Sequence, residues 1–213
     1  MAHWSHTDIM ALEGRFRANL INTIAGFKPA LLVGTTSSAQ EPNLAVFSNI
    51  FHIGASPPLI GLLVRPSPAG TDRHTLDNIV ETKHYTLNHF SSTQAASAHY
   101  TSARFNRHQS EFLACGFEAE WRDDHHAPYV ADATIQIGLE LVEHQLLAVN
   151  QTHLIIGSVR HVYMADELVR PDGSVDLEKA ESTVAAGLDS YHRVGRGQRF
   201  DYAKPDHLPH KKS

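Results

Sequence analysis

The segment from Glu41 to Pro66 constrains the fold more than any other part of this chain, because most of it is apolar and it contains two strand-like runs. A turn of Gly, Ser and Pro residues, Gly54 to Pro58, separates the runs and predicts a pair of adjacent strands. In the first run neither alternating face is wholly polar. We therefore expect this strand to be buried on both sides, against a core on one and a ligand or second subunit on the other.

Two polar residues, Ser48 and Asn49, lie in the middle of the first run. Buried polar groups require hydrogen-bond partners. Neighbouring backbone groups satisfy them in the purely structural interpretation, which these residues alone favour. In the functional interpretation they meet the polar edge of a flat ligand.

The second run, Leu59 to Val64, is apolar on both faces and contains Gly61, which indicates a bulge or a close approach by another group. Arg65 ends the run and needs an anion or water. Hydroxyl and basic residues then precede a helical pattern: Ser67, Thr71, Arg73, His74 and Thr75. A helix start of this kind is a candidate phosphate site; the alternative is an ordinary helix cap beside solvated arginines.

The rest of the chain alternates strand patterns with short helical patterns. Strands are expected at Ala30 to Thr36, Tyr85 to His89, Ile135 to Leu141 and His153 to Tyr163, the last two as a long antiparallel hairpin. Clean alternation in Ile135 to Leu141 predicts that this strand has one wet edge or face. Helices are expected where apolar residues keep helical spacing: Ile9 to Leu20, the segment after Thr75, Ser91 to Ala103, Ser110 to Gly116 and Leu177 to Tyr191. Strands joined mostly by turns favour an antiparallel barrel over a Rossmann sheet.

Composition limits the class of protein. The chain has 213 residues, enough for one domain, and we expect a single domain over residues 1–213 with a core of about 22–205, a helix before it and a tail after it. Lys and Arg number 18 against 23 Asp and Glu, a formal charge of −5, which argues against nucleic acid as the main partner. No signal peptide or membrane span is evident, so we expect a cytoplasmic protein.

Several other motifs receive no role. Asp123, Asp124, His125 and His126 form the densest group among 16 histidines, but the stretch is polar and is interpreted as a loop, so no metal is assigned. Cys115 is interpreted as a small buried apolar residue. Gly195 and Gly197 lack the third glycine and the preceding strand of a dinucleotide-binding fingerprint.

Six stretches in this order resemble the flavin reductase-like, FMN-binding split-barrel family. They are Asn43 to Pro66, Arg73 to Ile79, Thr86 to His89, His99 to Phe105, Gly187 to His192 and Phe200 to Pro205. The resemblance implies a β-rich α+β fold, an antiparallel split β-barrel with peripheral helices, which binds FMN in a cleft, usually at a homodimer interface.

The resemblance also implies roles for individual residues. The strand carrying Asn43, Ala45, Val46, Phe47, Ser48 and Asn49 is expected along the isoalloxazine ring. Arg65, Arg73, His74 and Thr75 are expected at the phosphate, and His99, Thr101 and Ser102 on the far wall. No catalytic residue is assigned, although His192 resembles positions on the nicotinamide side; its alternative is a surface histidine at a helix end.

The function expected from these features is that of an FMN-dependent oxidoreductase, an NAD(P)H:flavin reductase that passes electrons to free flavin or to a partner. A flavin carries such chemistry itself, so a missing catalytic triad does not argue against an enzyme. Two alternatives stay open: an FMN enzyme with a dedicated small-molecule substrate, and a non-catalytic flavin store or sensor. We expect a homodimer with NADH or NADPH as electron donor, and neither nucleic acid nor membrane as partner.

Overall fold

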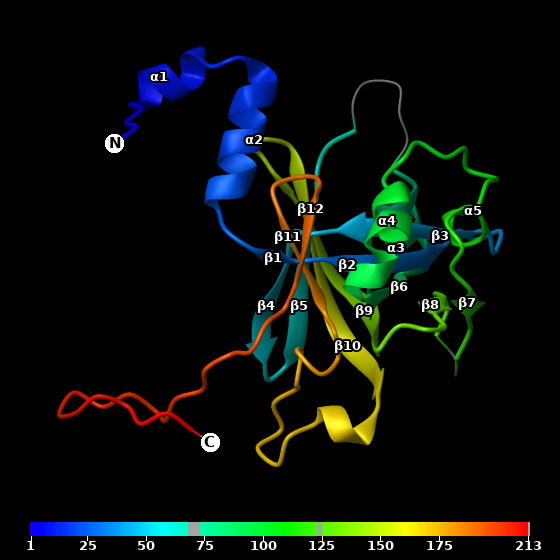
Figure 1. Ribbon diagram of the computed structural model, residues 1–213. Coiled ribbons are helices and arrows are strands. Elements are labelled where there is room, and N and C mark those ends of the chain that lie inside the picture. The colour runs from blue at the N-terminus through cyan, green and yellow to red at the C-terminus, as the bar shows by residue number, and fades with distance from the viewer. Residues whose placement is uncertain (68–72, 123–124, 213) are drawn as a thin grey trace.

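The computed structural model describes residues 1–67, 73–122 and 125–212, and its centre is a seven-stranded antiparallel sheet (Figure 1). The strands lie in the order β3-β2-β6-β9-β10-β5-β4. Their bounds are β2 (Leu31–Thr36), β3 (Pro42–Phe47), β4 (Ile50–Ala55), β5 (Pro58–Val64), β6 (His84–His89), β9 (Ile135–Leu147) and β10 (Thr152–Met164).

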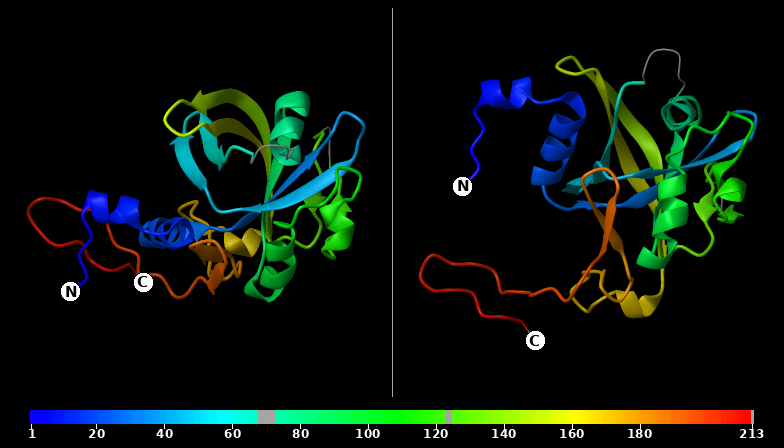
Figure 2. Two further views of the ribbon diagram at one scale, coloured as in Figure 1. Left: turned by 90° about the horizontal axis from the view of Figure 1, so that it is seen from above. Right: turned by 45° about the horizontal axis from the view of Figure 1, so that its top comes forward.

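The sheet curls around an interior but does not close (Figure 2, left). Its two outermost strands, β3 and β4, are consecutive in sequence, yet they pair with β2 and β5 rather than with each other. The short link between them, Ser48 and Asn49, therefore crosses from one edge of the sheet to the other. This is the split barrel that the sequence predicts.

The first run of the segment Glu41 to Pro66 was expected to be one strand buried on both sides, and that expectation is wrong. The chain turns at Ser48 and Asn49 because β3 and β4 bond to different neighbours. In β4, Phe51 and Ile53 remain 43% and 39% exposed. The close approach expected at Gly61 is confirmed: a Cβ added there would lie 2.5 Å from Cζ of Phe51.

Apolar side chains from most strands of the sheet fill the barrel interior. They include Leu31, Val33, Ile50, Leu62, Val64, Tyr85, Leu87, Leu139 and Ile155, with Leu76 and Ile79 supplied by α3 (His74–Thr82). A second cluster, which includes Leu32, Leu44, Phe90 and Phe112, joins the other face of the sheet to α4 (Ala95–Tyr100) and α5 (Glu111–Ala114). These two clusters hold α3 and α5 against β3.

The hairpin of β9 and β10 is confirmed, but the expected wet face of β9 is wrong at its start. Gln136 is only 2% exposed and donates a 2.7 Å hydrogen bond to the carbonyl of Val130. The small pair β7 (Ala119–Glu120) and β8 (Tyr129–Val130) supplies this cover. Alternation in the sequence identified the strand, whereas packing of the preceding β7–β8 pair decided which of its residues are buried.

Two helix predictions need correction. The N-terminal helix is two helices, α1 (His6–Ala11) and α2 (Gly14–Ile24), because the carboxylate of Glu13 caps α2 by accepting the backbone N–H groups of Arg15 and Phe16. The helix expected from Leu177 to Tyr191 is instead a hairpin of β11 (Thr183–Ala186) and β12 (Ser190–Arg193). Gly187 turns that hairpin at a φ of +66°, and β11 also pairs with β1 (Lys28–Pro29).

The remaining elements follow the sequence closely. The helix expected from Ser91 to Ala103 begins at η1 (Ser92–Gln94), where Ser91 and Gln94 form a capping box, and it ends at Tyr100 rather than Ala103. Another short turn, η2 (Asp166–Leu168), leads into the C-terminal region. Both termini project from the barrel (Figure 1), and no helix in the described ranges could span a membrane. The single-domain organisation stays a prediction.

Candidate functional site

A cleft of about 610 Å³ lies where β3, the end of β5, the start of α3 and the loop after α4 meet. Of the residues expected at a cofactor, the structure brings twelve into its lining: Asn43, Ala45, Val46, Phe47, Ser48, Asn49, Arg65, Arg73, His74, Thr75, Thr101 and Ser102. Segments almost 60 positions apart in sequence therefore share one site. Thr71, also considered for the phosphate, falls outside the described residues.

Two side chains from other elements hold the backbone of β3 in the cleft wall. The backbone N–H of Val46 donates to Oγ1 of Thr101 at 2.8 Å, and that of Leu44 donates to Oε2 of Glu111 at 3.2 Å. Thr101 also donates to the carbonyl of Ala98 at the end of α4. These bonds satisfy backbone donors on an outermost strand and fix its position relative to α4 and α5.

A buried network of amides and hydroxyls supports the start of α3. The side-chain amide of Asn43 donates to Oγ1 of Thr75 at 3.1 Å and to Oγ1 of Thr35 at 3.2 Å, and the amide of Asn78 donates to Thr35 at 3.1 Å. Asn43, Thr75 and Asn78 are each less than 8% exposed. Asn43 and Thr75 thus position the α3 start as well as lining the cleft.

The cleft carries a surplus of positive charge. Arg65, Arg73, Arg104 and Arg107 line it, and Glu111 is the single carboxylate among the described lining residues. Protein groups orient three of these arginines: Arg65 donates to Oδ1 of Asn22 at 2.6 Å, Arg73 to the Pro66 carbonyl at 3.1 Å, and Arg107 to Oδ1 of Asn78 at 3.3 Å. A cleft of this charge favours an anionic ligand.

Burial distinguishes Glu111 from the other charged groups of the cleft. Its side chain is 6% exposed, and this desolvation raises the pKa of its carboxyl above the usual value. Hydrogen bonds from backbone N–H groups, including that of Leu44, and the nearby charge of His74 act in the opposite direction. Glu111 was not expected from the sequence, because a lone acid before Phe112 carries no signal of its own.

Arg104, Asn106 and Arg107 were missed as well, together with Leu63, Val64, Ala103, Phe105 and Leu188. The run of mostly polar residues from Arg104 to His108 could have indicated Arg104 and Arg107 as candidate binding residues. Its meaning depended on the loop after α4 folding back over β3, which spacing along the chain does not reveal.

Two expected residues lie elsewhere. His99 is outside the lining of the cleft, and its Nδ1 is 3.0 Å from the hydroxyl of Tyr191. His192 lies in β12 rather than at a helix end, where it contacts the ring of Phe27 and lies 2.9 Å from Oγ of Ser190. Of that last motif, it is Leu188 that reaches the cleft.

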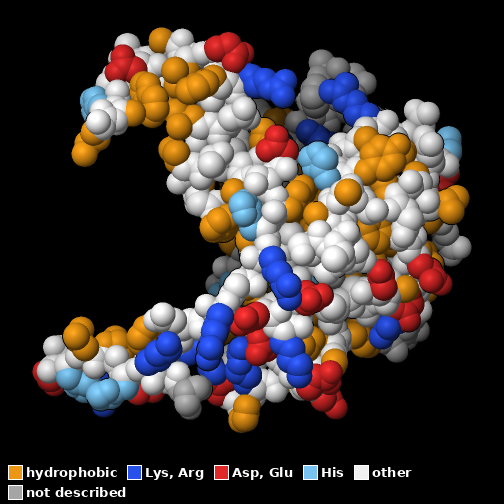
Figure 3. All heavy atoms as spheres, in the orientation of Figure 1, with side chains coloured by type: hydrophobic (Ala, Val, Ile, Leu, Met, Phe, Trp, Pro, Cys, Tyr) orange, Lys and Arg blue, Asp and Glu red, His pale blue; other side chains and the backbone are white. Residues whose placement is uncertain are grey.

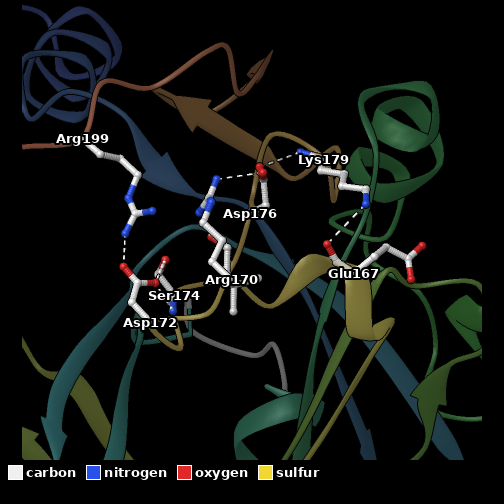
Figure 4. Close-up of polar contacts among 8 residues, drawn as sticks. Glu167, Arg170, Asp172, Ser174, Asp176, Lys179 and Arg199 are labelled. Carbon is white, nitrogen blue, oxygen red and sulfur yellow. Dashed lines mark hydrogen bonds and ion pairs between the residues drawn. The ribbon is translucent and has the colours of Figure 1, made fainter. Parts of the chain in front are cut away.

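A second cleft, of about 770 Å³, lies between the C-terminal segment and the turn that follows η2. Two ion pairs lie in its lining (Figure 4): Arg170 pairs with Asp176 at 2.8 Å, and Arg199 pairs with Asp172, while Arg196, Lys211 and Lys212 also line it. Lys179 also donates to the carbonyl of Glu167. None of the described residues expected at a cofactor lines this second cleft, so the cleft beside β3 is the better candidate site.

The remaining histidines and the cysteine do not form a second site of this kind. No group of three or more His, Cys, Asp or Glu residues in the described ranges is arranged to hold a metal, and Asp123 and Asp124 fall outside those ranges. Cys115 is buried, as expected, and burial raises the pKa of its thiol to about 11. A thiol with so high a pKa is a poor nucleophile.

Comparison with known proteins agrees with this geometry. A structure of a candidate flavin reductase with a split-barrel domain from Shewanella frigidimarina NCIMB 400 is 40% identical, with a TM-score of 0.91 over 95% of this chain and 100% of that one. Nitrilotriacetate monooxygenase component B from Bacillus cereus shares the fold at 19% identity, with a TM-score of 0.81 over 92% and 97% of the two chains.

An uncharacterised protein of Deinococcus radiodurans is 28% identical over 199 residues, which cover 92% of this chain and 84% of the relative. The family model for the flavin reductase like domain matches residues 25–176, a span that contains the barrel and almost all of the cleft lining. The chain therefore belongs to the flavin reductase-like family.

Proposed function

We propose that this protein is an FMN-dependent oxidoreductase, an NAD(P)H:flavin reductase that passes electrons to free flavin or to a partner protein. One observation carries the proposal: a cationic cleft beside an outermost strand, in a chain of the flavin reductase-like family. A flavin with a phosphate matches the charge of this cleft better than one without.

The donors of the cleft fit FMN at both ends of the molecule. Arg65 and Arg73 supply positive charge for a single phosphate, His74 adds a ring nitrogen beside them, and charge-assisted bonds from arginine suit phosphate oxygens. Ser48 and Asn49, at the corner between β3 and β4, offer hydroxyl and amide groups to the polar edge of the ring. Thr101 and Glu111 hold β3 in place, so the wall against the ring is fixed before the ligand arrives.

FMN, when bound, supplies the redox chemistry, by accepting two electrons from a nicotinamide and passing them on. The chain's own contribution is to bind the phosphate, orient the ring against β3 and limit access of water. This division of labour requires no acid or base from the protein at the electron-transfer step.

The experiment has two stages. The purified protein is examined for flavin absorbance, and apoprotein is titrated with FMN, FAD and riboflavin. We expect FMN to bind most tightly; a protein that binds none of them contradicts the cofactor. The FMN-loaded protein is then mixed anaerobically with NADH or NADPH in a stopped-flow spectrometer. Bleaching by at least one donor is expected, and a loaded protein that neither donor bleaches contradicts the reductase.

We also propose a homodimer. Helices α1 and α2 contain no buried residue, and Phe16, Ile21 and Ile24 of α2 are 52%, 44% and 68% exposed. Figure 3 shows apolar side chains gathered over this N-terminal arm. An isolated helix of this length is marginal in water, so a second copy that covers α2 would stabilise it. Light scattering is expected to give twice 23.6 kDa, and a monomer at all concentrations contradicts the dimer. We also propose that the protein is cytoplasmic.

A further inference from the structure

Glu111 is the one negative charge among the described residues that line an otherwise cationic cleft. It occupies the first turn of α5, and its Oε2 accepts the backbone N–H of Leu44 at 3.2 Å. A neutral amide or hydroxyl could accept the same hydrogen bond, as Thr101 does from Val46. The anchoring of β3 therefore does not explain why this position carries an ionisable group.

Glu111 lies close to the end of the cleft where the phosphate is proposed to bind. Leu44, its hydrogen-bond partner, follows Asn43, whose amide donates to Oγ1 of Thr75 at the start of α3. The charge of His74, in the same first turn of α3, acts on the Glu111 carboxyl. One chain of contacts thus links the carboxylate to the residues assigned to the phosphate.

Two negative charges in a buried site repel strongly, because water and salt screen them poorly. Besides Glu111, the charged or titratable residues of the described cleft lining are Arg65 after β5, Arg73 and His74 at the start of α3, and Arg104 and Arg107 of the loop after α4. Arg107 also pairs with Asp77 of α3 at 3.9 Å, and Cys115, next to α5, has a buried thiol that is neutral. Glu41, before β3, is paired with His108 at 2.6 Å. Of these groups, the Glu111 carboxylate is the one that opposes an incoming phosphate from within the cleft.

We propose that Glu111 makes binding of the flavin phosphate proton-linked, so that its carboxyl takes up a proton from solvent when the phosphate dianion enters the cleft. The inference rests on the proposed binding of FMN. Desolvation already raises the pKa of this carboxyl, and an adjacent dianion raises it further. Ionised Glu111 weakens the phosphate contacts and leaves the ring contacts unchanged, so Glu111 sets how strongly the cleft prefers FMN to riboflavin at a given pH.

The test compares wild type with Glu111→Gln. Glutamine keeps a carbonyl oxygen for the N–H of Leu44 and removes the charge. Dissociation constants for FMN and riboflavin are measured by flavin fluorescence between pH 5 and pH 8.5. The matched control is Glu118→Gln, the same charge change at an exposed position outside the cleft lining.

At pH 8 we expect Glu111→Gln to bind FMN about tenfold more tightly than wild type, the effect of a pKa change of about one unit on binding. The difference should shrink on acidification, because protonation of Glu111 removes the same charge from the wild type. Riboflavin affinity should be the same in both, and Glu118→Gln should follow wild type. Equal pH dependence in wild type and Glu111→Gln, or an equal gain for riboflavin, overturns the inference.

A second measurement applies if Glu111→Gln does not fold. In the His74→Gln protein, Glu111 is the one Asp, Glu or His side chain left among the described residues that line the cleft. Calorimetric titration with FMN at pH 7, in two buffers of different ionisation enthalpy, counts the protons exchanged. Net uptake supports the inference, and no exchange or net release overturns it. A wild-type protein that binds no flavin at any pH overturns the proposed function as well, whereas FMN binding without proton uptake overturns this inference alone.

Discussion

The interior of the barrel is filled by apolar side chains, whereas the cleft beside β3 gathers arginines, hydroxyls and amides. In the interior, Tyr85 of β6 packs directly under Gly157 of β10 and leaves no space for a further methyl group. In the cleft, Arg65 and Arg73 are exposed and each makes a hydrogen bond at its rim. Substitutions in the first region should therefore cost stability, and those in the second should cost binding.

The largest effect is expected from Gly157→Ala. An added Cβ would contact the hydroxyl of Tyr85 and lie 2.8 Å from its Cζ, and neither ring nor backbone can move freely in a packed interior. We expect the free energy of unfolding to fall by about 3 kcal/mol, the upper range for overpacking. Urea unfolding followed by circular dichroism measures it. Gly195→Ala, where nothing lies within 4 Å of the added Cβ, is the control.

The same contact can be tested from its other side. The Tyr85 hydroxyl is buried without a hydrogen-bond partner among the described residues, so Tyr85→Phe should leave stability unchanged or raise it by about 1 kcal/mol. Combined with Gly157→Ala, it should restore part of the lost stability. If the change in unfolding free energy of the double variant is the sum of the two single changes, the two residues do not interact.

The second effect concerns buried His125, which should make the stability of the fold, but not the binding of FMN, depend on pH. His125 is 4% exposed, and desolvation lowers its pKa to about 4. The unfolded chain binds the proton from about pH 6.5 downwards and the folded chain only near pH 4, so stability present at neutral pH is lost on acidification. The loss should reach about 3 kcal/mol at pH 4.

His125→Gln tests this contribution. Glutamine retains a donor for the carbonyl of Tyr85, which lies 3.1 Å from Nε2 of His125, and it does not titrate. Unfolding free energies at pH 4.5 and pH 7 should differ less in this variant than in wild type. His52→Gln, at an exposed position of β4, should leave the difference unchanged. An undiminished pH dependence in His125→Gln would contradict the assignment. FMN affinity should be the same in His125→Gln and in wild type.

The third effect belongs to the cleft. Arg73→Ala should weaken FMN at least tenfold and riboflavin much less, because a charge-assisted hydrogen bond to the phosphate contributes about 1.5–3 kcal/mol. Thr75 is a poorer test, since its hydroxyl accepts the amide of buried Asn43. Fluorescence titration with both flavins measures the change, with exposed Arg160→Ala as control. If FMN and riboflavin lose affinity equally, Arg73 stabilises the fold rather than binding the phosphate.

The smallest effect is expected at His192. It contacts Phe27 and Ser190 and does not line the cleft, so His192→Ala should change the rate of flavin reduction by NADH or NADPH by less than about twofold, a surface-like effect. Anaerobic stopped-flow measurements decide it. A rate loss of several orders of magnitude would show that His192 takes part in flavin reduction and that the functional site extends from the cleft to β12.

The sequence determined those features that depend on neighbouring residues. Strand patterns predicted β2, β6, β9 and β10, the pattern from Ser91 to Ala103 predicted a helix, and Gly61 indicated a close approach. Ordered motifs placed the chain in its family, and almost all the residues expected at the cofactor do line one cleft.

The tertiary structure decided what depends on partners distant in sequence. The segment Leu177 to Tyr191 has helical spacing, yet pairing with β1 and the turn at Gly187 make it a hairpin, because hydrogen bonds between strands outweigh a weak local preference. Ser48 and Asn49 became a corner because β3 and β4 bond to opposite edges of the sheet. Glu111 reached the cleft for the same reason: α5 packs on β3 across 67 residues of sequence.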